Sequence, residues 1–528
     1  MRSYYAHLTT TEPAAPANSI IPRPVMRTSA IFPVIQQAAI SSRILFMGYW
    51  ILKRNIHEIT TIVTLRTVQG KIIARTSFSI QEAKTFRIEL ADQLELAGLN
   101  RNSDFLGSLE VEFFSTQNFL FPYPAAVINY YGPQFSTVVH TAQRIYNDFE
   151  DMIKNTQTTV PESGFNIYVD SDKEPFISLI NGCVKTPKRT MRMFFINHAG
   201  QSMEYSHPLG EMNPYETTWI YPARHCNLKK FLNGMPGTAK VSFEVNWIFP
   251  RLVVGNIQNK LPALTITHSY YDCSEATADS DYWRAEEVGW HAAALMLPGA
   301  VSHHHFTNIY FYPIYSPSKF SVDIEIYSDR GALLGSKKEV ALIGKAELKI
   351  HCIDLKAICA ELGINFTHDC ALRLVIKNQK KGKIPARIKI GFDVGAGNIN
   401  TPCNICTNLQ PFNPSLENKP TSFRWCPVLA DQPKATLWIM NSSPAINYNR
   451  SAKISLTFFR ESDTKVLTRE IELPPHGFSI IRIPEDKELK SFFQGKIGWM
   501  TATTTNPYTT TYYFAENPSG VVGGDHGF

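Results

Sequence analysis

Phe320-Ser321-Val322-Asp323-Ile324-Glu325-Ile326-Tyr327 alternates apolar and polar residues over most of its length. A period of two buries one face of a segment and exposes the other, which is typical of antiparallel strands in β-sandwiches. The same alternation recurs at 60–67 and 453–459, whereas the helix candidates, at 353–362 and 485–493, are short. The sequence therefore predicts an all-β fold.

Working outward from these strands, a larger unit recurs four times: a strand hairpin, a corner, a strand, a short helix and two further strands. The corner carries Lys84 and Lys345 in the first and third units, and His225 and His476 in the second and fourth. The separations are similar, 345 − 84 = 261 and 476 − 225 = 251, which indicates two copies of an unlike pair, A–B–A–B. We therefore expect tandem antiparallel β-sandwich domains, divided into an arm at 1–36, A1 at 37–150, B1 at 151–275, A2 at 276–420 and B2 at 421–528.

Composition narrows the class of protein. The chain has 528 residues, of which 44% are hydrophobic and 19% charged, so it can build several cores and is not largely disordered. The formal net charge of +6 is small, and the densest basic cluster, at 377–383, is typical of a hairpin tip, so we expect no nucleic-acid partner. The sequence contains no run of 18 apolar residues, so it predicts no membrane-spanning helix.

Residues 1–20 contain no apolar core of a secretory signal. The nine cysteines follow no regular spacing. Together these observations predict reduced thiols and a cytoplasmic location.

One corner resembles a known family. Tyr221-Pro222-Ala223-Arg224, followed by a basic-apolar strand, resembles the small β-sandwich family of sensory rhodopsin transducers, and the strand–turn–strand before the fourth corner has a similar rhythm. The resemblance implies a compact sandwich that associates with copies of itself, as a homo-oligomer, and can bind a small ligand.

Each unit ends in a polar cluster after its final strand, at 140–148, 268–275, 400–408 and 516–526. Loops on a rigid sandwich often carry binding groups, and His, Asp and Glu together can ligate a metal or act as acid and base. The second and fourth clusters supply the candidate ligand-binding residues His268, Tyr271, Asp272, Glu275, Glu516, Asn517, Asp525 and His526. Pairing of the repeats about a pseudo-two-fold axis would bring these two clusters to one region. The alternative is that they form hydrogen bonds between domains.

Other motifs give weaker signals. His303-His304-His305 would alternate faces on a strand, so the three cannot reach one metal. Cys403 and Cys406 have zinc-ligand spacing but lack a clear second pair. We therefore predict no metal and no cofactor, and the common nucleotide, zincin and serine-hydrolase motifs are missing.

Aromatic residues near the second cluster, such as Tyr282 and Trp283, could stack on a sugar or simply fill a core. The sequence favours a non-catalytic binding or scaffold protein that presents inter-domain loops to a glycan, a small polar ligand or a protein partner. Two alternatives stay open. One is an enzyme, with or without a metal, that uses His268, Asp272, Glu275, Asp525 and His526 between domains. The other is a subunit of a structural assembly.

Overall fold

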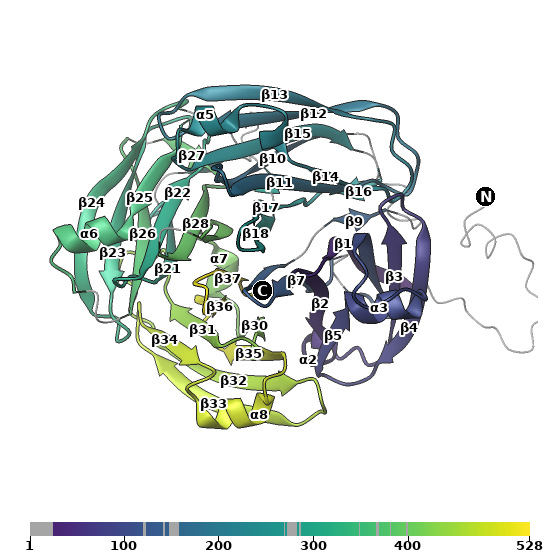
Figure 1. The fold of residues 1–528 in the computed structure, drawn as a ribbon. Helices are drawn as coiled ribbons and strands as arrows, with labels where there is room; N and C mark the ends of the chain where they lie inside the picture. The colour runs from purple at the N-terminus through teal and green to yellow at the C-terminus, as the bar shows by residue number, and fades with distance from the viewer. Residues whose placement is uncertain are drawn as a thin grey trace, which may run out of the picture.

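Antiparallel strands make up most of the computed structural model, so the predicted fold class, tandem all-β sandwiches, is confirmed. The structure describes residues 25–119, 123–140, 143–146, 158–245, 247–268, 270–271, 282–284, 287–347, 349–365, 369–380, 382–397 and 400–528. Within these residues, four two-sheet sandwiches follow one another along the chain and lie in a closed ring (Figure 1).

The first sandwich, A1, sets the pattern for the others. One sheet has the spatial order β1 (Met26–Gln36), β6 (Phe105–Ser115), β3 (Ile59–Thr67) and β4 (Ile72–Ile80). The facing sheet has the order β5 (Thr85–Glu89), β2 (Ser41–Met47), β7 (Val127–Gly132) and β8 (Phe135–His140). Helix α2 (Tyr49–Arg54) follows the second strand, and α3 (Leu90–Leu96) follows the fifth.

The other three sandwiches repeat this order, with a short helix after each fifth strand. In B1 one sheet has the order β10 (Thr158–Ile167), β15 (Gly237–Val245), β12 (Arg189–Ile196) and β13 (Ser202–Leu209), and β19 (Tyr270–Tyr271) is added beside β10. The facing sheet has the order β14 (Thr217–Ile220), β11 (Lys173–Ile180), β17 (Val253–Gln258) and β18 (Ala263–His268). The helices of B1 are η1 (Pro222–Arg224) and α5 (Leu228–Leu232). In A2 they are β21 (Ala293–Gly299), β26 (Cys370–Asn378), β23 (Phe320–Tyr327), β24 (Leu333–Ile343), and β25 (His351–Asp354), β22 (His305–Phe311), β28 (Lys389–Ala396), β29 (Cys403–Asn408), with α6 (Leu355–Glu361). In B2 they are β30 (Ser422–Val428), β35 (Gly498–Thr504), β32 (Ala452–Arg460), β33 (Val466–Leu473), and β34 (Phe478–Arg482), β31 (Lys434–Asn441), β36 (Thr509–Glu516), β37 (Val522–His526), with α8 (Lys487–Phe493).

Short elements lie at the connections between sandwiches. Strand β9 (Arg144–Ile145) pairs with β16 (Ile248–Phe249), and β20 (Tyr282–Arg284) pairs with β27 (Lys383–Pro385). Helix α7 (Pro414–Glu417) precedes the fourth sandwich.

Local sequence explains where the crossover helices begin. Asp354 precedes α6 and accepts a hydrogen bond from the backbone N–H of Ala357 at 3.1 Å. Asp486 precedes α8 and accepts one from the N–H of Leu489 at 3.0 Å. Aspartate favours this position because its carboxylate satisfies an N–H that has no partner within the helix.

Two expectations need correction. The arm was expected to extend to residue 36, but Met26–Gln36 forms strand β1, which pairs along its length with β6 and carries the buried core residue Phe32. The corner histidine His225 was expected to match His476. Instead, His476 lies before the fifth strand of its sandwich, whereas His225 follows η1 and comes after the fifth strand, β14. Lysine and histidine therefore do not mark equivalent corners in all four units.

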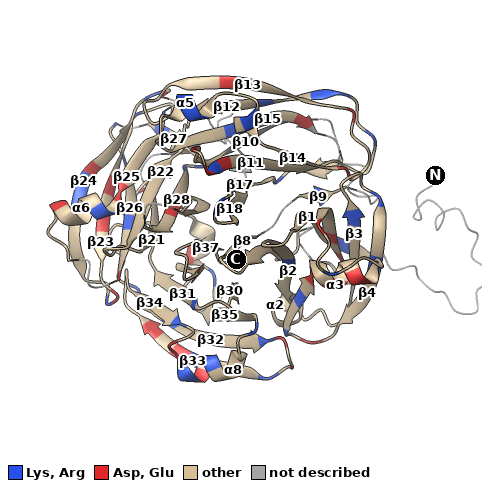
Figure 2. Cartoon of the chain, in the orientation of Figure 1, with Lys and Arg blue, Asp and Glu red and all other residues tan. Residues whose placement is uncertain are grey.

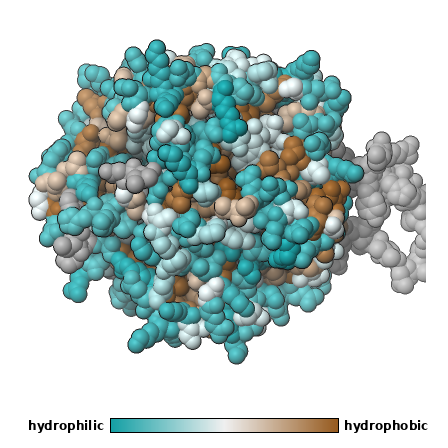
Figure 3. Space-filling model, in the orientation of Figure 1, coloured by the Kyte–Doolittle hydropathy of each residue, from teal (hydrophilic) through white to brown (hydrophobic). Residues whose placement is uncertain are grey.

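The centre of the ring is built from the eighth strands, because β8 contacts β18 and β37, and β29 contacts the same two strands. Their sequences contain no Lys, Arg or Glu, and Asp525 is their one acidic residue. Charged residues gather instead on outer strands such as β24 and β33 (Figure 2). The face of the ring in Figure 3 is accordingly mostly hydrophilic, with scattered apolar side chains.

Each seam between neighbouring sandwiches holds polar side chains with partners on the opposite side. The contacts are Arg66 over the ring of Tyr215 for A1–B1, Asn166 to Asp393 for B1–A2, Arg373 to the carbonyl of Ser443 for A2–B2, and Arg43 to Asp431 for B2–A1. No chain connection bridges B2 and A1 directly, so the stacked rings of Tyr49 and Trp425, 5.0 Å apart, and the Arg43–Asp431 pair close the ring non-covalently.

Candidate functional site at the axis of the ring

Four equivalent strand ends meet at the axis. The last residues of β8, β18, β29 and β37 are His140, His268, Asn408 and His526. The first three pair with the opening residue of the preceding strand, at Val127, Val253 and Lys389. His526 pairs with Tyr512, the fourth residue of β36. The ends of the eighth strands thus supply three histidines and one asparagine near the axis.

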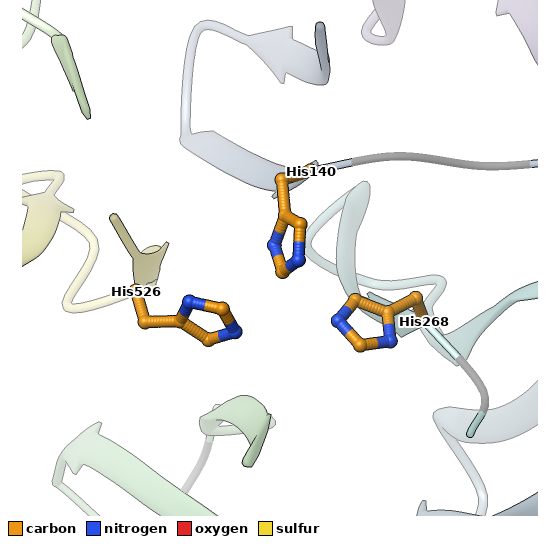
Figure 4. A group of neighbouring side chains, drawn as sticks. All are labelled: His140, His268 and His526. Atoms are coloured by element: carbon orange, nitrogen blue, oxygen red, sulfur yellow. The ribbon is translucent and has the colours of Figure 1, made fainter. Parts of the chain in front are cut away.

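The three histidine rings lie close together. The ring centroids of His140 and His268 are 4.6 Å apart, those of His140 and His526 are 4.4 Å apart, and those of His268 and His526 are 6.4 Å apart. One side-chain nitrogen from each lies within 4.8 Å of the other two. Figure 4 shows the rings arranged around a common space. His140 is 7% exposed and His268 is 1% exposed, so the cluster is largely shielded from water.

Two hydrogen bonds fix the orientation of these rings. Nδ1 of His140 donates to Oδ2 of Asp525 at 2.8 Å, and the same carboxylate oxygen accepts from the backbone N–H of His140 at 2.9 Å. Nδ1 of His526 donates to the carbonyl oxygen of Gly527 at 2.9 Å. Because both acceptors require a proton on Nδ1, the neutral forms of His140 and His526 present Nε2 as a lone-pair nitrogen.

Burial controls ionisation here. Desolvation, with a smaller contribution from the neighbouring His140, lowers the pKa of His526 to about 4, so this ring is neutral at pH 7. Burial alone would raise the pKa of Asp525, but the charge and hydrogen bonds of His140 hold it below its usual range. The site therefore contains an ionised carboxylate that accepts a hydrogen bond from the ring of His140.

A cavity of about 530 Å³ adjoins the cluster and includes His526 in its wall. Three arginines line it, Arg251 from B1, Arg387 from A2 and Arg424 from B2, and its described lining contains no Asp or Glu. Burial lowers the pKa of Arg424, whose Nε donates to the carbonyl of Thr509 at 2.9 Å. The rest of the lining combines polar and apolar groups: Trp283, Leu295, Ala386, Thr407, Asn408, Leu409, Gln410, Pro411, Thr510, Thr511, Tyr512 and Gly527.

The structure brings together three of the residues predicted from the second and fourth clusters, His268, Asp525 and His526. Glu516 lies elsewhere, at the A2–B2 seam, where it accepts from Nε2 of His305 at 2.8 Å and from Nζ of Lys434 at 2.5 Å. Asn517 occupies the turn between β36 and β37, at the opposite end of β37 from His526.

The remaining predicted residues belong to the segment after β18. Tyr271 pairs with Glu162 through strand β19, and its side chain lies outside the described part of the chain. Asp272 and Glu275 also lie outside the described residues.

The candidates predicted from the sequence do not include His140 or the three arginines. His140 is the first residue of the first polar cluster. A shared pattern points to it, because Phe135–His140, Ala263–His268 and Val522–His526 all end in histidine. No comparable signal marks the arginines, because Arg251 and Arg387 lie in two different connections between strands and Arg424 lies within β30.

The weaker metal motifs do not form sites among the described residues. His305 pairs with Glu516 across a seam, away from the axis. Cys403 and Cys406 lie in β29 but belong to different apolar clusters, so they do not face one place. The eight described cysteines are free thiols. None of the described helices has the length and hydropathy needed to cross a membrane.

Comparisons with known proteins give little further information. No protein-family model matches the chain, and no curated protein matches it. Among solved structures, one similar chain is described as a tetra-tandem repeat in the extending region of a large adhesion protein. It is 10% identical, and the match covers 89% of this chain and 91% of that chain, with a TM-score of 0.08. So low a TM-score carries no argument about fold or function.

Proposed function

We propose that this protein is a binding protein that takes a small anionic ligand in the axial cavity. The observation that carries the proposal is the convergence of Arg251, Arg387 and Arg424 from three sandwiches on one cavity. Arginine is suited to phosphate and carboxylate groups, because its planar guanidinium can donate two parallel hydrogen bonds.

The size and lining of the cavity fit a small molecule. Its volume of about 530 Å³ lies within the usual range of small-molecule sites, about 300–1,000 Å³. Asn408 and Gln410 supply amide groups, and Trp283 supplies a flat apolar face. This combination suits a polar molecule that carries at least one phosphate or carboxylate. The proposed ligand is therefore more specific than the glycan or small polar ligand expected from the sequence.

Isothermal titration with inorganic pyrophosphate and with citrate tests this proposal. We expect saturable binding of at least one probe at one site per chain. Arg387 is exposed, so Arg387→Gln should leave the fold intact while weakening binding about 10-fold or more, since a hydrogen bond to a charged group contributes about 1.5–3 kcal/mol.

Arg330→Gln is the matched control, because Arg330 lies in the exposed turn after β23, outside the cavity lining. It should bind both probes as the unchanged protein does. The proposal is wrong if neither probe binds saturably, or if Arg330→Gln loses as much affinity as Arg387→Gln.

A further inference from the structure

We propose that His140, His268 and His526 form a site for one divalent transition-metal ion at the axis of the ring, with Zn²⁺ as the best match. The inference stands apart from anion binding, since it rests on the histidine cluster and not on the arginines. It also departs from the sequence-based expectation that no metal binds.

Distances within the cluster allow a metal with small side-chain adjustments. The three candidate nitrogens lie within 4.8 Å of one another. Tetrahedral zinc with Zn–N bonds of about 2.0–2.1 Å places its nitrogen ligands about 3.3–3.4 Å apart. Small rotations of the imidazoles, which move their ring nitrogens by up to about 1 Å, close that difference. The three rings already surround one space (Figure 4).

The hydrogen bonds behind the rings have the arrangement that metal-binding histidines use. Such a histidine donates its second ring N–H to a carboxylate or a backbone carbonyl, which fixes the tautomer and the ring orientation. His140 does so to Asp525 at 2.8 Å, and His526 does so to the carbonyl of Gly527 at 2.9 Å. Two of the three rings are thus held with Nε2 available to a metal.

The donor set selects the class of metal. Imidazole nitrogen suits zinc, copper, nickel and iron, whereas calcium and magnesium require oxygen ligands. Three histidines supply three ligands and leave a position for water or another molecule, as in open zinc sites. His526 also lines the cavity, so that position can adjoin the anion site. The last residue of the eighth strand in the third sandwich is Asn408, whose amide is a weaker ligand.

Zinc titration of the full chain after EDTA treatment and dialysis tests the proposal. We expect one Zn²⁺ per chain, and a higher melting temperature in its presence. His268→Asn and His140→Asn remove the imidazole while keeping a polar side chain at the end of the strand. Each should weaken Zn²⁺ binding by about 100-fold or more, and Asp525→Asn should weaken it by about 10–100-fold.

His225→Asn is the matched control. His207 and His225 form a second pair of neighbouring histidines, with ring centroids 5.1 Å apart, in B1. The control and Arg387→Gln should both retain full Zn²⁺ affinity, and the second variant separates the metal site from the anion site.

A spectroscopic measurement keeps the test decisive if an axial variant fails to fold. Co²⁺ bound to the unchanged protein should show the strong visible absorption of four- or five-coordinate cobalt, which Zn²⁺ removes by displacement. Failure of the EDTA-treated protein to bind Zn²⁺ overturns the proposal. Retention of full affinity in folded His268→Asn overturns it as well, since the histidines would then serve only as buried packing between sandwiches.

Discussion

Glu110→Ala is expected to lower the free energy of unfolding by about 3–5 kcal/mol, because it removes the carboxylate that pairs with the buried Arg66 at the A1–B1 seam, whereas Arg27 keeps its ion pair with Glu112 at 2.8 Å. Glu110 pairs with Arg27 at 3.1 Å and with Arg66 at 2.8 Å. The side chains of Glu110, Arg27 and Arg66 are 1%, 5% and 4% exposed, so water cannot replace the lost carboxylate. Urea unfolding, with hydrogen exchange of the β6 amides to localise the effect, measures the loss.

A double substitution distinguishes this cause from simple loss of packing. Burial raises the pKa of Glu110, and repulsion from Glu112 adds to this, while Arg66 and Arg27 oppose it. The ion pair therefore has a high desolvation cost, and Glu110→Leu combined with Arg66→Met should recover much of the stability that Glu110→Ala loses.

Glu361→Ala is the control for an exposed pair. Glu361 contacts Lys337 on the outer surface, where the two side chains are 56% and 40% exposed. Its removal should change stability by less than about 1 kcal/mol. A loss for Glu110→Ala as small as that of the control would contradict the assignment of this network to the seam.

The strands were predictable wherever one face of a sheet meets a core and the other meets solvent. The segment at 320–327 forms β23 with these bounds, because its alternation reports a half-buried sheet. Strand β1 was not predictable in this way. Its outer face is buried against B1, where Ile31 joins a core with Ile145 and Ile177, so Ala30 to Ile35 form a nearly continuous apolar run.

The ring itself was not predictable, because its seams bury polar residues that look solvent-facing in a sequence. Asn166, Arg43 and Asp393 are all buried, yet each would be expected at a surface from its residue type. The hydrophobic period also predicts on which face of a sheet a residue lies, but it does not predict which strand of another sandwich that residue contacts. His268 and His526 were therefore identified as candidates, whereas their convergence with His140 depends on the packing of four eighth strands.

Several predictions lie outside what the fold tests. The resemblance to sensory rhodopsin transducers, the homo-oligomer that it implies and the cytoplasmic location stay predictions. Four sandwiches of one strand order already associate within this chain, so a gel-filtration mass above 59.6 kDa would be needed to support further association.

Stability is expected to fall by about 3 kcal/mol between pH 4 and pH 8 through Asp393 alone. Asp393 is fully buried at the B1–A2 seam, and burial raises its pKa to about 6 from a usual value of 3.8. A raised pKa in the folded protein means that the neutral acid is favoured there. The stabilisation is therefore complete below about pH 4, and it is lost as the pH rises through about 6 and the buried carboxyl ionises.

Asp393→Asn should remove this dependence without breaking the local hydrogen bonds. Oδ1 of Asp393 accepts from Nδ2 of Asn166 at 3.0 Å and from Nδ2 of Asn404 at 2.7 Å, and Oδ2 accepts from the hydroxyl of Tyr168. An asparagine keeps the first two bonds through its oxygen, and its amide nitrogen can donate to the Tyr168 oxygen. Tyr168 and Tyr310, which face the same group, stay neutral because burial raises their pKa values.

Urea unfolding from pH 4 to pH 8 compares the two proteins. Asp393→Asn should match the unchanged protein near pH 4 and exceed its stability by about 3 kcal/mol at pH 8. Asp486→Asn is the control of opposite sign, because hydrogen bonds from Arg469 lower the pKa of Asp486 to about 2. This variant should be less stable than the unchanged protein above about pH 4 and equally stable below about pH 2. Equal pH dependence in Asp393→Asn and the unchanged protein would show that Asp393 ionises normally, and hence that water reaches the B1–A2 seam.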